Sequence, residues 1–187
     1  SNGLALILVP PAEHGQRSLD ALGIDGAILV EPAAVDPDIA RLRERGLPFV
    51  SVGKVAEAED IPFVDLHSAW TTSLLLQHLW AQGARQIALV VGRQARNSYL
   101  EAESAYAGFA ADRHMRRRVL RIDETGGEAA GREACRRLLA EEPEIDGICA
   151  MVDAFAVGAL QAAGDLGRAV PADLKVVTRY DGPRARE

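Results

Sequence analysis

The segment VVTRYDG, residues 176–182, places polar chemistry directly after an apolar run. Its first three residues suit a buried strand, whereas Arg179, Tyr180 and Asp181 add a guanidinium, a phenol and a carboxylate just before a Gly-Pro turn. Side chains two apart in a continuing strand share a face, so Arg179 and Asp181 can form an internal ion pair that fixes the strand end. Alternatively, Asp181 accepts hydrogen bonds from a ligand, and Arg179 orients it or binds a ligand carboxylate or phosphate.

Sequence signatures of catalysis are missing. No GxSxG, HExxH or GxGxxG motif occurs, and the four histidines are widely spaced. Cys135 and Cys149 have no CxxC or neighbouring histidine, so both are expected to be ordinary buried thiols. We therefore expect no enzymatic activity, no catalytic residues, no metal and no cofactor.

The composition limits the possible partners. The chain has 187 residues, 48% of them hydrophobic, and a net charge of −6, which disfavours direct binding to a phosphate backbone. No apolar run reaches the roughly 18 residues that a membrane helix needs, and the first residues lack a basic region typical of a signal peptide. These features predict a cytoplasmic protein without a membrane partner.

Apolar runs alternate with segments of helical spacing along the chain. Continuous apolar runs are typical of parallel strands covered on both faces, and their alternation with helices predicts βαβ units and an α/β fold. The expected strands are 4–9, 25–30, 48–52, 87–91, 118–122, 146–152 and 174–178, and the expected helices are 36–46, 68–83, 97–113, 126–142 and 154–167. Helix caps are expected at Asp36 and Ser68, and glycine stops at Gly46, Gly83 and Gly167.

One connection lacks a helix. The segment IPFVDL, residues 61–66, follows the strand 48–52 through a charged connector, and it could carry the chain from one sheet to another. We therefore expect two lobes, residues 1–65 and residues 66–187.

Ligands of open parallel sheets bind beyond the carboxyl ends of the strands. Several strand-end positions here are polar or aromatic, which predicts a pocket for a small polar molecule. These positions are Pro10 and Pro11, Glu31 and Pro32, Gly53 and Lys54, 65–67, 92–99, 123–126, 153–155 and 179–181.

Five motifs in order resemble the LacI/GalR family of bacterial transcriptional regulators. HLWAQGARQIALVVG (78–92) resembles the family pattern HLxxxGxxxIxxxxG, and GLPFVSVGK (46–54) resembles GxPxVxxxR. IDGAILVEP is similar to a family strand that opens with Asp-Gly, DAFAVGAL (153–160) to DxxAxGA, and VVTRYDG to VVGYDD.

This resemblance implies an effector-binding domain of the periplasmic-binding-protein type I fold, with two Rossmann-like lobes and parallel sheets. A sugar, nucleoside or similar small-molecule effector would bind between the two lobes of each chain, and two chains would form a homodimer. Operator DNA would be bound only through a helix-turn-helix module that precedes this segment, and both lobes would be partial, with the final crossover strands missing. The alternative is a secreted solute-binding protein of a sugar transporter, which would share the lobes and the site between them.

The resemblance carries over to the binding residues unevenly. Asp181 matches the family aspartate that commonly accepts hydrogen bonds from ligands, whereas Arg179 replaces a small residue. His67 and Ser68 replace the usual Asp-Asn, Val152 replaces the asparagine before Asp153, and Ala105 replaces an arginine that often anchors the ligand. The strand-end positions and the family resemblance together give these expected effector-binding residues: Asp181, Arg179, His67, Tyr99, Glu101 and Asp153.

Overall fold

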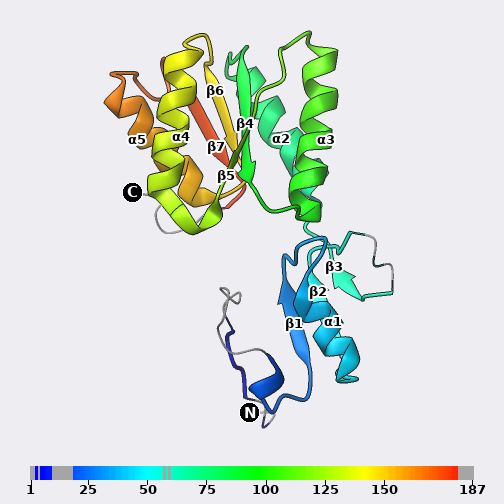
Figure 1. Cartoon of the computed structure of the whole chain (residues 1–187). Helices are drawn as coiled ribbons and strands as arrows, with labels where there is room; N and C mark the ends of the chain where they lie inside the picture. The colour runs from blue at the N-terminus through cyan, green and yellow to red at the C-terminus, as the bar shows by residue number, and fades with distance from the viewer. Residues whose placement is uncertain (1–2, 4, 10–18, 57, 59, 181–187) are drawn as a thin grey trace.

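The computed structural model contains two parallel sheets joined by the chain around residues 65–67 (Figure 1). It describes residues 3, 5–9, 19–56, 58 and 60–180. The first sheet has the order β1-β2-β3 and the second β5-β4-β6-β7, with every neighbouring pair parallel. We call the part that contains the first sheet the N-lobe and the part that contains the second sheet the C-lobe.

The N-lobe is built on short strands. A 3-10 turn, η1 (Leu19–Ala21), is followed by β1 (Ala27–Val30), α1 (Pro37–Glu44), β2 (Phe49–Val52) and β3 (Phe63–Val64). The α1 residue Ile39 packs with Val55, Ile61, Leu29 and Phe49 to form a small core. The Asp36 side chain caps α1 by accepting from the Asp38 N–H at 2.9 Å, with proline at the first helical position, as predicted.

The predicted strand 4–9 is wrong over its described residues. Residues 5–9 are outside any strand, and Leu6 and Leu8 are exposed. An apolar run forms a strand only where a neighbouring strand accepts and donates its backbone hydrogen bonds. Residues 5–9 pair with none of the described strands, so their hydrophobicity alone does not order them as β-structure.

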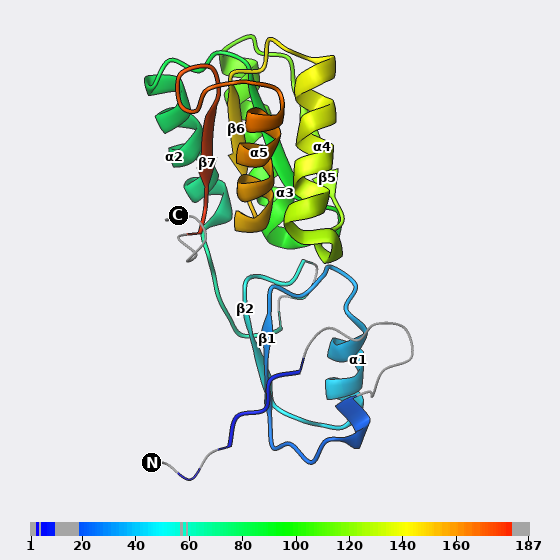
Figure 2. The same ribbon diagram turned by 90° about the vertical axis from the view of Figure 1, so that its left-hand side faces the viewer.

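The C-lobe has three layers. Its elements are α2 (Ser68–Ala81), β4 (Ile87–Gly92), α3 (Asn97–Asp112), β5 (Val119–Ile122), η2 (Glu124–Gly126), α4 (Gly127–Glu141), β6 (Gly147–Ala150), α5 (Asp153–Asp165) and β7 (Lys175–Thr178). Helices α2 and α3 cover one face of the sheet, and α4 and α5 cover the other (Figures 1 and 2).

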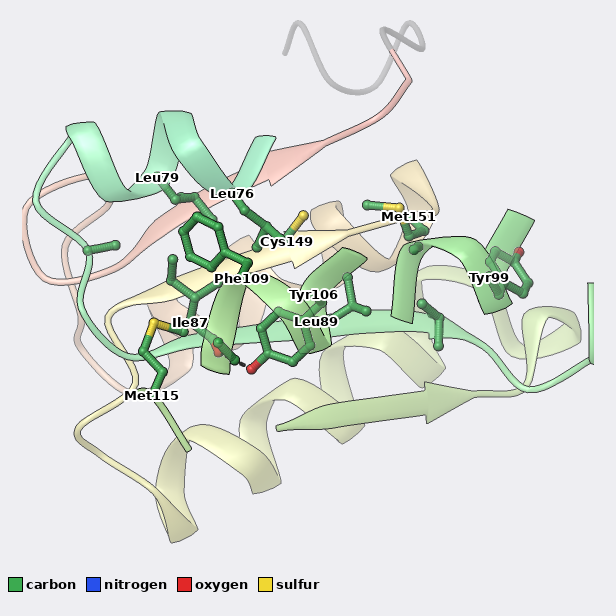
Figure 3. Close-up of a cluster of buried hydrophobic side chains, with 14 residues drawn as sticks. Leu76, Leu79, Ile87, Leu89, Tyr99, Tyr106, Phe109, Met115, Cys149 and Met151 are labelled. Carbon is green, nitrogen blue, oxygen red and sulfur yellow. Dashed lines mark hydrogen bonds between the residues drawn. The ribbon is translucent and has the colours of Figure 1, made fainter. Parts of the chain in front are cut away.

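Side chains of β4 alternate between the two faces. Ile87 and Leu89 pack under α2 and α3 with Tyr106 and Phe109, as Figure 3 shows, whereas Ala88 and Val90 pack under α4 and α5. All six residues of β4 are buried, as expected for a central parallel strand. In the described part of the chain, no helix is both long and apolar enough to cross a membrane.

The helix caps follow the sequence with one exception. Gly46, Gly83 and Gly167 have φ of +65°, +91° and +67° just after α1, α2 and α5, as predicted for C-terminal stops. The predicted cap at Ser68 is wrong, because His67 is the N-cap and makes no side-chain cap hydrogen bond. The left-handed backbone of His67, with φ 47°, makes Ser68 the first helical residue. The Ser68 hydroxyl instead contacts Arg179.

Candidate functional site

The two lobes touch where strands of both sheets end. The segment after β1 lies against the segment before α3, where the Ala34 N–H donates to the Ala95 carbonyl at 2.8 Å. Ala33 and Arg96 form an isolated antiparallel bridge, and the Arg96 guanidinium donates to the Glu31 carbonyl. These contacts join the lobes at a place separate from the covalent crossover at residues 65–67. Figures 1 and 2 show this boundary beneath the sheet of the C-lobe.

Arg179 connects the end of β7 to the N-lobe. Its side chain is only 6% exposed, and its Nη2 lies 3.4 Å from Glu31 Oε2. Nη1 donates to Ser68 Oγ at 3.0 Å, and Nη2 also donates to the Tyr180 hydroxyl at 2.5 Å, with the guanidinium 4.5 Å from the centre of the Tyr180 ring. Among the described residues, the acidic partner of Arg179 is thus a carboxylate that lies 148 positions away in the chain.

Glu31 contacts side chains of the C-lobe through its carboxylate. Its side chain is 13% exposed, and its Oε2 accepts a 2.6 Å hydrogen bond from Ser98 Oγ as well as the Arg179 contact. Glu31 has φ 49°, a left-handed conformation that costs a non-glycine residue about 1–2 kcal/mol. Strain of this kind is common at functional sites, where the surrounding contacts maintain it.

Gly53 leaves room for the Glu31 side chain. Gly53 follows β2 with φ +93°, and a Cβ added to it would lie 2.7 Å from Glu31 Oε1. Glu31 also donates its backbone N–H to the Val52 carbonyl at 2.8 Å, so the ends of β1 and β2 together fix its position. The local sequence therefore directs this carboxylate out of the N-lobe toward Arg179 and Ser98.

A second polar group lies at the end of β4. The Tyr99 hydroxyl donates to Glu124 Oε1 at 2.6 Å, and Arg96 Nε lies 3.7 Å from Glu124 Oε2. A Cβ on Gly92 would lie 2.5 Å from the Tyr99 ring, so glycine at the strand end admits this pair. Burial, followed by the hydrogen bond to Glu124, raises the pKa of Tyr99 above its ordinary value of 10, which keeps the phenol protonated as a donor.

Asp153, another residue expected from the sequence, lies in the C-lobe near Tyr180. Asp153 begins α5, and its carboxylate accepts from the Ala154 N–H at 2.9 Å. Burial raises the pKa of Tyr180, and the charges of Glu31 and Asp153 raise it further against the opposing charge of Arg179. The Asp153 carboxylate is thus close enough for its charge to act on the Tyr180 phenol.

His67 and Glu101 are more peripheral, and Asp181 lies outside the described residues. The His67 side chain is 77% exposed, and its Nδ1 lies 3.5 Å from Asp65 Oδ2. Glu101 accepts a 2.8 Å hydrogen bond from the Asn97 side chain within the first turns of α3. Neither of these two side chains hydrogen-bonds to Arg179, Glu31 or Tyr99 within the described residues.

Sequence reasoning did not select Glu31, Ser98 or Glu124 as site residues, although all three occupy predicted strand-end segments. The protein partner expected for Arg179 was Asp181, which lies outside the described residues, and the ion pair that the structure describes joins Arg179 to Glu31. The available signal was the strand-end rule itself, since Glu31 is the residue directly after β1.

Several polar atoms of these groups are buried without a hydrogen-bond partner among the described residues. They are Arg179 Nε, Arg96 Nε, Glu124 Oε2 and Thr178 Oγ1. Buried polar groups in proteins are usually satisfied, so such atoms are candidates for contacts with a ligand or water. Across the residues that the structure describes, no group of three His, Cys, Asp or Glu side chains could hold a metal ion. The side chains of Arg179, Ser98 and Tyr99 offer hydrogen bonding and charge recognition.

A separate groove lies between α4 and α5, and its lining shares no residue with the strand-end groups. It has a volume of about 540 Å³ and is lined by Glu128, Ala129, Arg132, Glu133, Arg136, Gln161 and Asp165. Arg132 donates to both carboxylate oxygens of Asp165 at 2.6 Å across it. This ion pair already uses the charged groups that span the groove, so we favour the strand-end groups as the ligand site.

Comparison with known proteins identifies the family. A family model described as periplasmic binding proteins and sugar binding domain of LacI family matches residues 4–185. The chain belongs to this family. The resemblance and the α/β, periplasmic-binding-protein-like fold predicted from the sequence are confirmed.

Relatives of this LacI-family domain are named as regulators. The ribose operon repressor of Halalkalibacterium halodurans is 31% identical over 176 residues, which cover 91% of this chain and 50% of the relative. An uncharacterised HTH-type transcriptional regulator of Streptomyces limosus is 30% identical over 179 residues, covering 86% of this chain and 48% of the relative. The chain thus spans about half the length of the curated relatives it matches.

A solved structure supports the same assignment. The structure described as a complex of the transcriptional regulator CelR with cellobiose is 27% identical and aligns with a TM-score of 0.77. The alignment covers 88% of this chain and 51% of that chain.

Proposed function

We propose that this LacI-family chain is the effector-sensing part of a LacI/GalR-type bacterial transcriptional regulator. A small polar metabolite, such as a sugar or nucleoside, binds between residues 1–65 and residues 66–187. The observation that carries the proposal is the family match over residues 4–185, together with polar side chains of both lobes that meet at the strand ends. The relatives are named as transcriptional regulators or repressors, which favours regulation over the role of a secreted solute-binding protein.

The rest of the regulator follows from the family. The working protein is a cytoplasmic homodimer that binds operator DNA through a helix-turn-helix module N-terminal to this segment, and it is not an enzyme. A ligand that contacts both lobes shifts their arrangement only by its differential affinity for the two arrangements. That shift would be transmitted to the DNA-binding module.

Arg179, Asp181, Tyr99 and Asp153 are the principal effector-binding residues in this proposal, with His67 and Glu101 at the periphery. Arg179 and Tyr99 have support in their burial at the strand ends, and Asp153 in its electrostatic coupling to Tyr180. Asp181 has support in the family motif.

A thermal-shift screen of sugars, nucleosides and their phosphates on this chain tests the proposal. A cognate effector should raise the melting temperature with a saturable dose dependence. Loss of one charge-assisted hydrogen bond weakens affinity by about 10- to 100-fold, so Arg179→Met and Asp181→Ala should each remove the shift at moderate ligand concentrations. Arg43→Met, an exposed change on α1, is the control and should leave the shift intact. An equal shift in all four proteins would show that the ligand binds elsewhere.

A further inference from the structure

The carboxylate of Glu31 occupies a position that the C-lobe builds for an anion. The Arg179 guanidinium and the Ser98 hydroxyl both face the same oxygen, Glu31 Oε2, at 3.4 and 2.6 Å. Both groups belong to the C-lobe, whereas Glu31 belongs to the N-lobe. We call the Arg179 and Ser98 side chains the anion slot.

The anion slot is only loosely filled. A guanidinium that is 6% exposed requires a negative partner, because an uncompensated buried charge is costly. Glu31 meets it at the outer limit of a hydrogen bond, and Arg179 Nε has no partner among the described residues. By contrast, Arg132 binds Asp165 through two bonds of 2.6 Å. A ligand anion that approached the guanidinium side-on could use donors that Glu31 leaves unsatisfied.

The surrounding backbone also favours an anion. Ser98 is the second residue of α3, and Ser68, which accepts from Arg179 Nη1, is the first residue of α2. Neither helix has a side-chain N-cap hydrogen bond. The N-terminus of a helix carries partial positive charge and uncapped N–H groups, so two such ends reinforce the charge of Arg179.

We propose that the anion slot is a subsite for a carboxylate or phosphate group of the effector, and that Glu31 is an internal occupant which this group displaces. The proposal rests on the proposed function, and it narrows the effector to an anionic metabolite, such as a sugar phosphate or sugar acid. Displacement breaks the Glu31–Arg179 contact between the lobes, so ligand binding and this contact exclude each other. Glu31 therefore lowers the affinity for the effector, whereas an ordinary contact residue would raise it.

Inorganic sulfate is a suitable probe because it is fully ionised and independent of the identity of the metabolite. Its dissociation constant is measured by titration at constant ionic strength, with chloride as the balancing anion. Glu31→Ala should bind sulfate about 10-fold or more tightly than wild type, since the competing carboxylate is gone. Glu31→Ala/Arg179→Met should lose that gain. Equal sulfate affinity in Glu31→Ala and the double variant would overturn the proposal, as would weaker binding in Glu31→Ala than in wild type.

Circular dichroism of each variant in chloride establishes that it is folded. If Glu31→Ala does not fold, Glu31→Gln, which keeps the size of the side chain and removes the charge, makes the same comparison with its own Arg179→Met double variant.

A metabolite comparison separates failure of this proposal from failure of the proposed function. Glucose, glucuronate and glucose 6-phosphate differ mainly in the anionic group. Their dissociation constants are measured by the same titration, as are those of any metabolite identified in the thermal-shift screen. A neutral metabolite that binds wild type and is weakened by Glu31→Ala would overturn the anion subsite while the effector-sensing function stands. The sulfate result expected above, without binding of any metabolite, would instead support the anion subsite and count against effector sensing.

Discussion

The contact between Glu31 and Arg179 should contribute measurable coupling to stability. At 3.4 Å and an effective dielectric constant of about 20, the gross attraction of two unit charges is about 5 kcal/mol. Desolvation of the two largely buried side chains offsets more than half of it, and we expect a coupling free energy of about 2 kcal/mol. A double-mutant cycle of Glu31→Gln and Arg179→Met, measured by urea denaturation, gives this quantity directly.

An exposed ion pair provides the control. Arg43 donates to both oxygens of Asp60 at 2.7 and 2.6 Å, but the two side chains are 48% and 71% exposed. The cycle for this pair should give less than about 1 kcal/mol despite its shorter distances, because water screens it. If the effects of Glu31→Gln and Arg179→Met simply add, or if their coupling is no larger than that of Arg43 and Asp60, the described contact between the lobes is wrong.

Three other predictions concern the C-lobe. Gly158→Ala should lower the free energy of unfolding by about 2 kcal/mol in urea denaturation, because the added Cβ would lie 2.7 Å from the Glu128 carbonyl oxygen. Gly164→Ala, in the same helix, meets open space and should raise that free energy by up to about 1 kcal/mol. Tyr106→Phe should cost about 1–3 kcal/mol in the same assay, because the hydroxyl donates to the Ile87 carbonyl and accepts from the Arg118 N–H; Figure 3 shows Tyr106 beside Ile87. A neutral change would contradict this role. Burial raises the pKa of the Cys135 and Cys149 thiols to about 12, so neither should react with a thiol reagent at pH 8 until the protein unfolds, and rapid reaction of the native protein would refute their burial.

The sequence predicted the C-lobe well because its signals are local. Continuous apolar runs correspond to β4, β6 and β7, and the ends of α2 and α5 coincide with glycines that adopt positive φ. The predicted strand 4–9 is wrong over its described residues 5–9, because strand formation depends on a partner strand, which a local pattern does not reveal. The cap at Ser68 failed because the chain enters α2 through a left-handed histidine, a conformation that residue type alone does not predict.

The site was predictable only in part, because a local sequence pattern does not reveal which distant residues come into contact. The strand-end rule drew attention to the segments that contain Glu31, Tyr99 and Arg179, because parallel strands end at one edge of a sheet. It did not predict the contact of Arg179 with Glu31, since Glu31 lies in the other lobe and reaches across through its own strained backbone and the space left by Gly53. Such a pairing depends on how the two sheets face each other.

A crystal structure of this chain with a metabolite identified in the screen tests the central claim most directly. We predict that the metabolite lies between the two sheets at the ends of β1, β4 and β7, within hydrogen-bonding distance of Arg179. Electron density for the metabolite in the groove between α4 and α5, with the Glu31–Arg179 contact intact and the strand ends free of ligand, would contradict it.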